Sequence, residues 1–203
     1  MSGRETNGSG AAAAPLRLRL VTSASQLTSS EGWSAVTMAR LADAVGVSRQ
    51  TVYNEIGGKH ALAEAMVLHE LSLFLAGVDE QFARHDDLVE AIRGASRDVL
   101  EMARTNPLLR AILSASHGAG SDLLPLLTTQ SEMVLETATS VIRTHLERYD
   151  LPLEPKQLDV GIEMVVRLVL SHVMQPSQAP ARTADDIAWL AGQVLQVSAQ
   201  PRS

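Results

Sequence analysis

The stretch "TMARLADAVGVSRQTVYNEIGGK", residues 37–59, constrains the fold of this 203-residue chain more than any other segment. Thr37 precedes a short run with apolar residues at helical spacing, Gly46 ends that run, and Ser48 precedes a second short run. Threonine and serine accept hydrogen bonds from the free amides at a helix start, and glycine adopts the left-handed conformation that ends a helix. The segment therefore predicts two short helices joined by a tight turn, a helix-turn-helix unit whose second helix faces outward.

The second of these helices carries side chains suited to DNA. Arginine can bond guanine edges, glutamine and asparagine can bond adenine edges, and a threonine methyl can contact thymine. The residues expected to read bases are Arg49, Gln50, Thr51 and Asn54. Those expected to hold the unit on phosphates are Thr37, Ser48, Tyr53 and Lys59. The residues alone leave open an alternative, in which the unit serves only for packing and these side chains are ordinary solvated positions.

The net charge of -6 argues against a nucleic-acid partner for the chain as a whole, but its distribution is uneven. Residues 1–68 carry six basic and five acidic side chains, whereas residues 69–203 carry eleven and eighteen. An anionic partner is therefore expected near the N-terminus.

Helical periodicity extends over nearly the whole sequence and predicts an all-α fold with about nine helices. Residues 1–13 are expected to form a disordered tail, residues 14–62 the helix-turn-helix domain, and residues 63–203 a larger helical domain. The helices expected outside the segment already described are 16–30, 59–86, 88–104, 107–116, 123–149, 155–174 and 184–198, the last capped by Thr183.

The N-terminal segment resembles the DNA-binding domain of the tetracycline-repressor (TetR) family of bacterial regulators. The family pattern is matched by Gly32-Trp33, Thr37, Gly46-Val47-Ser48, Val52-Tyr53 and Lys59-His60-Ala61-Leu62, so that Leu16 to Leu62 follow one register. The chain departs from the pattern at Glu55 and Ile56, where the family usually has an aromatic residue and phenylalanine. A carboxylate repels phosphate, so Glu55 is expected to point away from DNA or to pair with Lys59 at i+4.

The resemblance implies a C-terminal domain that binds a small molecule and forms a homodimer. The helix at 155–174 is apolar on nearly every face, and the final helix carries an apolar stripe, so these two are expected to form a four-helix interface with their symmetry mates. The expected dimer residues are Leu158, Ile162, Val165, Val169, Ile187, Leu190 and Val194. A two-fold dimer places its two reading helices roughly 34–36 Å apart, or a multiple of that distance, and predicts a pseudo-palindromic operator.

Inward-facing residues of the central helices are the candidates for a ligand pocket: Phe74, Met102, Leu109, Leu113, Met133, Thr137, Met164 and Leu168. A methionine-rich lining with little charge suits a flexible apolar ligand. Each of these residues can equally be plain core. The C-terminal segment is also similar to that of actinobacterial TetR regulators tied to fatty-acid or alkane metabolism, which implies a long-chain fatty acid or acyl-CoA as effector.

Several classes of protein are excluded or disfavoured. Cysteine is absent, which removes disulfides, thiolate metal sites and thiol nucleophiles, and the six histidines never recur at i+3 or i+4. No cofactor, metal or membrane span is expected, and the protein is expected to be cytoplasmic. The rival interpretation is a helical lipid-binding protein or an acyl-thioester enzyme without DNA binding, although no nucleophile with a nearby base is recognisable.

Overall fold

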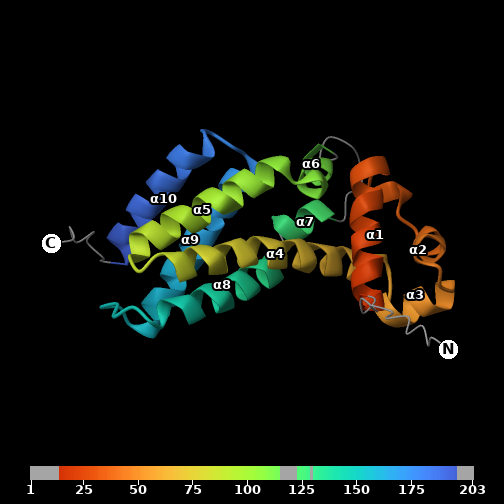
Figure 1. Ribbon diagram of the computed structural model, residues 1–203, viewed down its shortest axis with the longest axis horizontal. Coiled ribbons are helices and arrows are strands. Elements are labelled where there is room, and N and C mark those ends of the chain that lie inside the picture. The colour runs from red at the N-terminus through yellow and green to blue at the C-terminus, as the bar shows by residue number, and fades with distance from the viewer. Residues whose placement is uncertain (1–13, 115–122, 129, 196–203) are drawn as a thin grey trace, which may run out of the picture.

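The computed structural model describes residues 14–114, 123–128 and 130–195, and within these segments all regular structure is helical. The N-terminal unit lies at one end of an elongated molecule and the C-terminal bundle at the other, with the long helix α4 running between them (Figure 1). The tail expected at residues 1–13 lies outside the described residues. The expectation of an all-α fold with an N-terminal helix-turn-helix is confirmed.

The N-terminal unit follows from its capping residues. It consists of α1 (Leu16–Glu31), the 3₁₀ turn η1 (Trp33–Ala35), α2 (Met38–Val45) and α3 (Arg49–Ile56). Thr37 Oγ1 accepts a hydrogen bond from the Arg40 amide at 3.2 Å, and Ser48 Oγ accepts one from the Thr51 amide at 3.0 Å. Gly46 adopts a left-handed conformation with φ of 74°, which ends α2 and turns the chain into α3.

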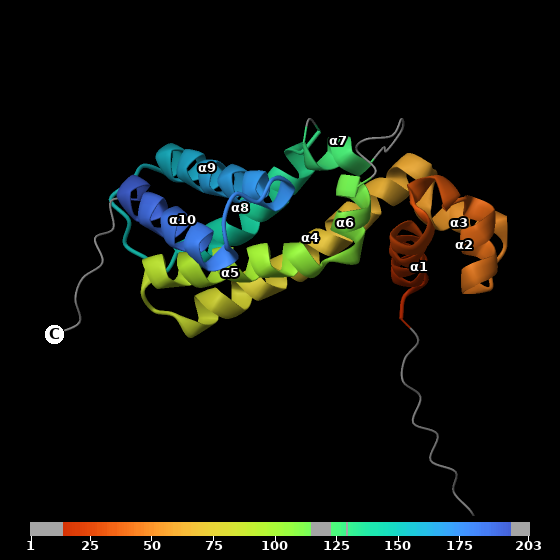
Figure 2. The same ribbon diagram turned by 90° about the horizontal axis from the view of Figure 1, so that it is seen from above.

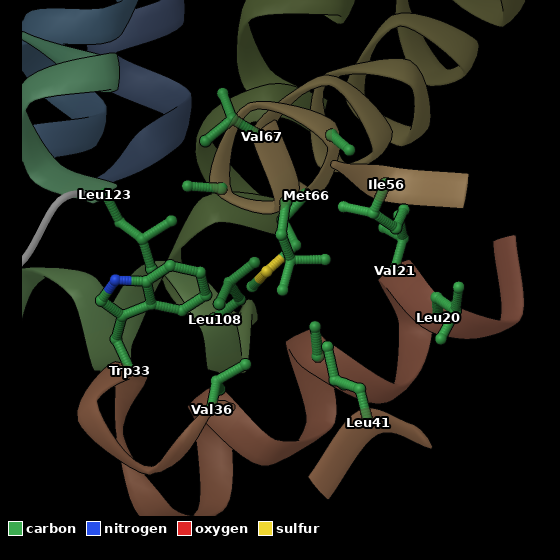
Figure 3. Close-up of a cluster of buried hydrophobic side chains, with 14 of the residues drawn as sticks. Leu20, Val21, Trp33, Val36, Leu41, Ile56, Met66, Val67, Leu108 and Leu123 are labelled. Carbon is green, nitrogen blue, oxygen red and sulfur yellow. The ribbon is translucent and has the colours of Figure 1, made fainter. Parts of the chain in front are cut away.

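One hydrophobic core joins this unit to the rest of the chain. The helix α4 (Lys59–Arg84) begins within the N-terminal unit and buries Met66 there completely. Figure 3 shows Trp33, Met66 and Leu108 converging from η1, α4 and α6, with Leu123 beside the tryptophan ring. The core of the N-terminal unit therefore includes side chains that follow residue 62.

A second core fills the C-terminal bundle. Its helices are α5 (Leu88–Thr105), α6 (Pro107–Ser114), α7 (Leu123–Leu127), α8 (Glu132–Leu146), α9 (Pro155–Met174) and α10 (Pro180–Val194). The helix α5 packs against both α4 and α10, and α9 packs against α8 and α10 (Figure 2). Phe82, Leu100, Leu135 and Ile187 contribute to this core from four different helices. Among the described helices, α4 alone is long and apolar enough to cross a membrane, but it packs against α1, α5 and α8 within the fold.

The single helix expected at 123–149 is wrong, because the structure divides it into α7 and α8. The Pro125 carbonyl accepts hydrogen bonds from the Thr128 amide at 3.1 Å and from the Gln130 amide at 2.7 Å. These bonds close a turn, and α8 starts again after the buried Ser131. The apolar periodicity continues through the break, which is why the sequence pattern did not reveal it.

The start expected for the last helix, capped by Thr183, is also wrong. The helix α10 begins at Pro180, the first helical position, where the fixed φ of proline and its missing amide favour a helix start. Thr183 is buried inside the first turn, and its amide donates to the Ala179 carbonyl at 3.1 Å.

Candidate DNA interface and effector cavity

The helix α3 presents its polar face to solvent because its apolar face is anchored. Val52 and Ile56 are buried against α1 and α2 in the N-terminal core. The side chains left outside are those predicted to read bases or contact phosphate: Arg49, Gln50, Tyr53 and Asn54 are exposed, and Thr51 is half-buried. Tyr53 keeps 48% of its surface accessible, so its ring and hydroxyl group are open to a partner.

Hydrogen bonds preorganise this face. Gln50 Nε2 donates to Asn54 Oδ1 at 2.9 Å, one helical turn away. The pair keeps the Gln50 carbonyl oxygen and the Asn54 amino group for a base edge. Adenine offers a matching donor and acceptor in the major groove, so the two side chains can read it together. Ser48 Oγ lies 2.8 Å from Thr51 Oγ1, which orients the threonine at the helix start.

Lys59 is held by Trp33 rather than by Glu55. Its Nζ donates to the Trp33 carbonyl oxygen at 3.0 Å and lies 4.7 Å from the centroid of the indole ring. The pairing of Lys59 with Glu55 considered from the sequence does not form, because the ammonium lies against η1. Glu55 is exposed on α3 instead. The ammonium can still bond a phosphate with its other two protons.

Two arginines on α1 hold the helix-turn-helix from behind, and sequence reasoning missed them. Arg19 donates to the Val45 carbonyl at 2.7 Å, and Arg17 donates to the Glu55 carbonyl at 2.8 Å. Both acceptors lie in the last turns of α2 and α3, where free carbonyls and the helix dipole favour a cation. The only signal in the sequence was a pair of arginines in the otherwise apolar start of α1.

The loop between α1 and α2 is fixed by an ion pair. Arg40 donates two hydrogen bonds to the Glu31 carboxylate, at 2.6 and 2.9 Å, and a third to the Ala35 carbonyl. The Arg40 hydrogen bond lowers the pKa of Glu31 below its ordinary value. This bidentate pair ties α2 to the end of α1 and so helps to orient the unit that presents α3.

An apolar cavity of about 160 Å³ lies inside the C-terminal bundle. Its lining comes from α4, α5, α6, α8 and α9, with Leu127 of α7 and Leu195 after α10. Along α4 the lining runs from Val67 to Phe82, a length of about 22 Å at the helical rise. Branched aliphatic side chains dominate, and Glu70 and Ser96 are the polar exceptions. An elongated ligand with little polarity suits this shape and chemistry.

The structure separates the residues predicted for a ligand pocket. Phe74 and Leu109 line the cavity. The other six do not: Met102 and Met164 are exposed on the outside of their helices, Met133 packs against the N-terminal core, Leu113 lines a different hollow, and Thr137 and Leu168 lie outside the lining. Because α9 is apolar on nearly every face, its pattern could not show that Val165, Val166 and Val169 face inward instead. The cavity is therefore aliphatic rather than methionine-rich.

The residues predicted for the dimer interface are divided in the same way. Leu190 and Val194 are exposed, at 40% and 42% of their surface. The other five face into their own chain: Ile162 and Ile187 are buried, Val165 and Val169 line the cavity, and Leu158 is half-buried against the core. These five side chains are covered by other helices of the same chain rather than by a partner subunit.

An apolar surface does remain on these two helices. Val160 and Met164 of α9 are each 52% exposed, and Trp189 of α10 is 66% exposed. Together with Leu190 and Val194 they form what we call the α9–α10 face. The two helices are in contact here, since a Cβ atom at Gly161 would lie 3.4 Å from Val194 Cγ1. The face extends over both helices, and its side chains are exposed to solvent in the described chain.

Comparisons with known proteins agree with this architecture. Residues 20–66 match the family model for bacterial regulatory proteins of the tetR family, and residues 87–193 match the C-terminal domain of the bacterial tetracycline repressor. The chain belongs to the TetR family. It is 30% identical to the HTH-type transcriptional regulator AlkX of Mycobacterium tuberculosis over 159 residues, 78% of this chain and 74% of AlkX.

Solved TetR-family structures show the same fold. The repressor AlkX of Dietzia sp. strain DQ12-45-1b, implicated in the biodegradation of n-alkanes, has 28% sequence identity and a TM-score of 0.74, covering 98% of this chain and 100% of that one. The repressor FadR of Thermus thermophilus in complex with lauroyl-CoA has 20% identity and a TM-score of 0.59, covering 92% and 96%. The second likeness shows the fold alone.

Membership of the TetR family makes this protein a DNA-binding regulator rather than an enzyme. Within the residues that the structure describes, no group of three or more histidine, aspartate or glutamate side chains is arranged to hold a metal ion. The structure therefore offers two candidate sites, the polar outer face of α3 and the apolar cavity beside α4.

Proposed function

We propose that this TetR-family regulator is a cytoplasmic repressor that binds a pseudo-palindromic operator as a homodimer and is released by an apolar effector, such as a long-chain fatty acid or acyl-CoA. The similarity to AlkX of Dietzia, a repressor implicated in n-alkane biodegradation, supports both the sign of regulation and the apolar effector. No cofactor is needed for such a cycle.

The DNA interface in this proposal is the outer face of α3 with the residues that frame it. Arg49, Gln50, Thr51 and Asn54 read base edges. Phosphates are contacted by Thr37, Ser48, Tyr53 and Lys59. Thr37 and Ser48 also cap the starts of α2 and α3. The exposure of the reading residues and the hydrogen bond between Gln50 and Asn54 support this assignment.

The dimer in this proposal forms through the α9–α10 face. Leu190 and Val194 stay in the proposed interface, now joined by Val160, Met164 and Trp189. Burying a tryptophan and four aliphatic or thioether side chains against their symmetry mates supplies the apolar centre that a stable interface needs. Two-fold symmetry then presents two copies of α3 to successive major grooves.

The proposal that an apolar effector releases the DNA rests on the apolar cavity. Val67 lines the cavity and also belongs to the N-terminal core, and Leu108 and Ile112 of α6 do the same. A ligand that changes the spacing of α4 and α6 therefore acts on the packing of the helix-turn-helix as well. An effector with higher affinity for the altered spacing shifts the population toward dimers that no longer fit the operator.

The experiment is fluorescence anisotropy of the purified protein on DNA from immediately upstream of its own gene and on scrambled DNA of the same length. Binding is measured at two salt concentrations, and then with dodecanoate added. We expect tight binding to the upstream DNA that persists at higher salt, and release by dodecanoate. Equal, salt-labile binding to both DNAs would contradict operator recognition on that segment.

The measurement also tests the rival interpretation, a lipid-binding helical protein without DNA function. That rival predicts dodecanoate binding with no sequence preference on any DNA. If the Tyr53→Ala variant loses both DNA binding and the regulatory effect that the parent protein has in cells, the interpretation as a lipid-binding protein without DNA function is wrong.

A further inference from the structure

A second hollow of about 230 Å³ lies where α5, α6, α9 and α10 meet. Three basic side chains line it: Arg104 from α5, Arg110 from α6 and His172 from α9. The rest of the lining is apolar or uncharged and includes no carboxylate. We call this hollow the cationic cleft.

The two arginines of the cleft are not neutralised. Five other arginines of the C-terminal bundle have a carboxylate within 4.0 Å, namely Arg84, Arg93, Arg97, Arg143 and Arg167. No ion pair or side-chain hydrogen bond of Arg104 or Arg110 is present among the described residues. Residues 69–203 carry eighteen acidic and eleven basic side chains, so carboxylates outnumber the basic groups that could pair with them. Two unpaired guanidinium groups in one concave site favour an anion from outside.

The start of α10 and His172 also border the cleft. Pro180 and Thr183 belong to the first turn of α10, whose N-terminal end carries the positive pole of the helix dipole. His172 Nδ1 lies 3.3 Å from Ser177 Oγ, which orients the ring and leaves its other nitrogen for the cleft. The cleft thus combines two guanidinium groups, an imidazole and a helix N-terminus.

The cleft lies next to the apolar cavity. Val173 lines both hollows. On α5, Val99 faces the cavity while its neighbour Leu100 faces the cleft. On α6, Leu109 and Arg110 divide in the same way. Because Val173 borders both hollows, a shift of this side chain would connect them, and a molecule with an apolar chain and an anionic head could then place each part in matching surroundings.

We propose that the cationic cleft binds the anionic head, a carboxylate or a phosphate, of an amphipathic effector whose apolar chain occupies the cavity. This inference rests on the proposed effector function and extends it. The cavity accounts for affinity for a chain, and the cleft selects ligands that end in an anion over neutral ones of the same length.

Calorimetric titration of the full-length protein with dodecanoate and dodecyl phosphate below their critical micelle concentrations, and with dodecanol below its solubility limit, tests the proposal. We expect at least one anionic ligand to bind roughly tenfold more tightly than dodecanol, as charge-assisted hydrogen bonds to two arginines imply. In the double variant Arg104→Gln/Arg110→Gln this preference disappears while dodecanol binding is unchanged. The control Arg97→Gln, on the same helix but paired with Glu101, keeps the preference.

The arms of the experiment separate the possible outcomes. Preference for dodecanoate or for dodecyl phosphate identifies the head group. Equal binding of all three ligands, or a preference that survives in the double variant, overturns the proposal that the cleft binds the head group. If the ligands still release DNA, the proposed effector function is unaffected. Inorganic phosphate that binds as tightly as dodecyl phosphate also overturns it, because the chain then contributes nothing. Failure of every ligand to bind or to release DNA overturns the proposed effector class as well.

Discussion

Gln50 is the residue whose environment most directly suggests base recognition. Its amide is fixed by Asn54 at 2.9 Å, so the order needed to meet a base edge already exists before DNA binds. A side chain held in this way loses less rotamer entropy on binding than a free one. Residues of this kind discriminate between sequences, whereas cations such as Lys59 bind any phosphate.

Replacing Gln50 with alanine should therefore relax sequence preference. We expect Gln50→Ala to lose about 1–3 kcal/mol on operator DNA, and much less on scrambled DNA, because only base contacts are removed. Anisotropy titrations on both DNAs measure the two losses. The control is Gln175→Ala, an exposed glutamine after α9, which should change neither. Equal losses on both DNAs would show that Gln50 does not read bases.

Replacing Lys59 should have the opposite signature. We expect Lys59→Gln to weaken operator and scrambled DNA alike, and to reduce the slope of log affinity against log salt by about one, since one phosphate contact is lost. The chain's other lysine, Lys156 at the start of α9, supplies the matched variant Lys156→Gln, which should leave the slope unchanged. An unchanged slope in Lys59→Gln would mean that this ammonium serves only to anchor Trp33.

Among the elements, the α2–α3 turn depends on a backbone conformation that only glycine adopts without strain. Gly46 has φ of 74°, and no atom lies within 4 Å of the position of a Cβ there, so the penalty for a side chain is conformational rather than steric. Gly77 differs, because it lies inside α4 and a Cβ would meet Met102 Sδ at an ordinary distance of 3.7 Å.

These two glycines should respond in opposite directions to the same substitution. We expect Gly46→Ala to lower the free energy of unfolding by about 1–2 kcal/mol, the cost of a left-handed non-glycine residue. We expect Gly77→Ala to raise it by about 0.5–1 kcal/mol through higher helix propensity. Chemical denaturation followed by circular dichroism measures both. A Gly46→Ala variant as stable as the parent would rule out strain at this turn.

At the scale of the whole molecule, α4 gives the protein two connected cores. The N-terminal core and the cavity share Val67, so the part that reads DNA and the part that accepts a ligand are not mechanically independent. The helices α9 and α10 lie in the bundle, at the other end of the molecule from α3 (Figure 1). A dimer formed there leaves both copies of α3 free for DNA.

Disrupting this face should separate the subunits. We expect Trp189→Glu, combined with Met164→Glu, to convert a dimer into a monomer of 21.7 kDa, because four carboxylates would have to be buried across the two-fold axis. Operator affinity should fall about 100-fold or more, since each half-site is then bound separately. Light scattering and anisotropy measure the two effects. Leu73→Glu, at a 47% exposed leucine on α4, is the control expected to remain dimeric. A double variant that stays dimeric would place the interface elsewhere.

The sequence by itself determined those features that depend on local backbone chemistry. Thr37 and Gly46 specify where α2 begins and ends, and Ser48 specifies where α3 begins, because caps and left-handed turns act within four residues of themselves. Glu163 and Arg167 of α9 lie four positions apart and form an ion pair at 2.8 Å, which also depends only on local helix geometry. The all-α class and the polar outer face of α3 follow from periodicity alone.

Only the tertiary structure decided which side of each apolar helix faces the cavity, the core or a partner. On α9 almost every position is apolar, so Val165 and Met164 look alike in sequence, although one lines the cavity and the other lies on the surface. The contacts of Arg19 with Val45 and of Lys59 with Trp33 join residues 26 positions apart, beyond the reach of any helical repeat. The cationic cleft is assembled from four helices, because packing alone brings Arg104, Arg110 and His172 together.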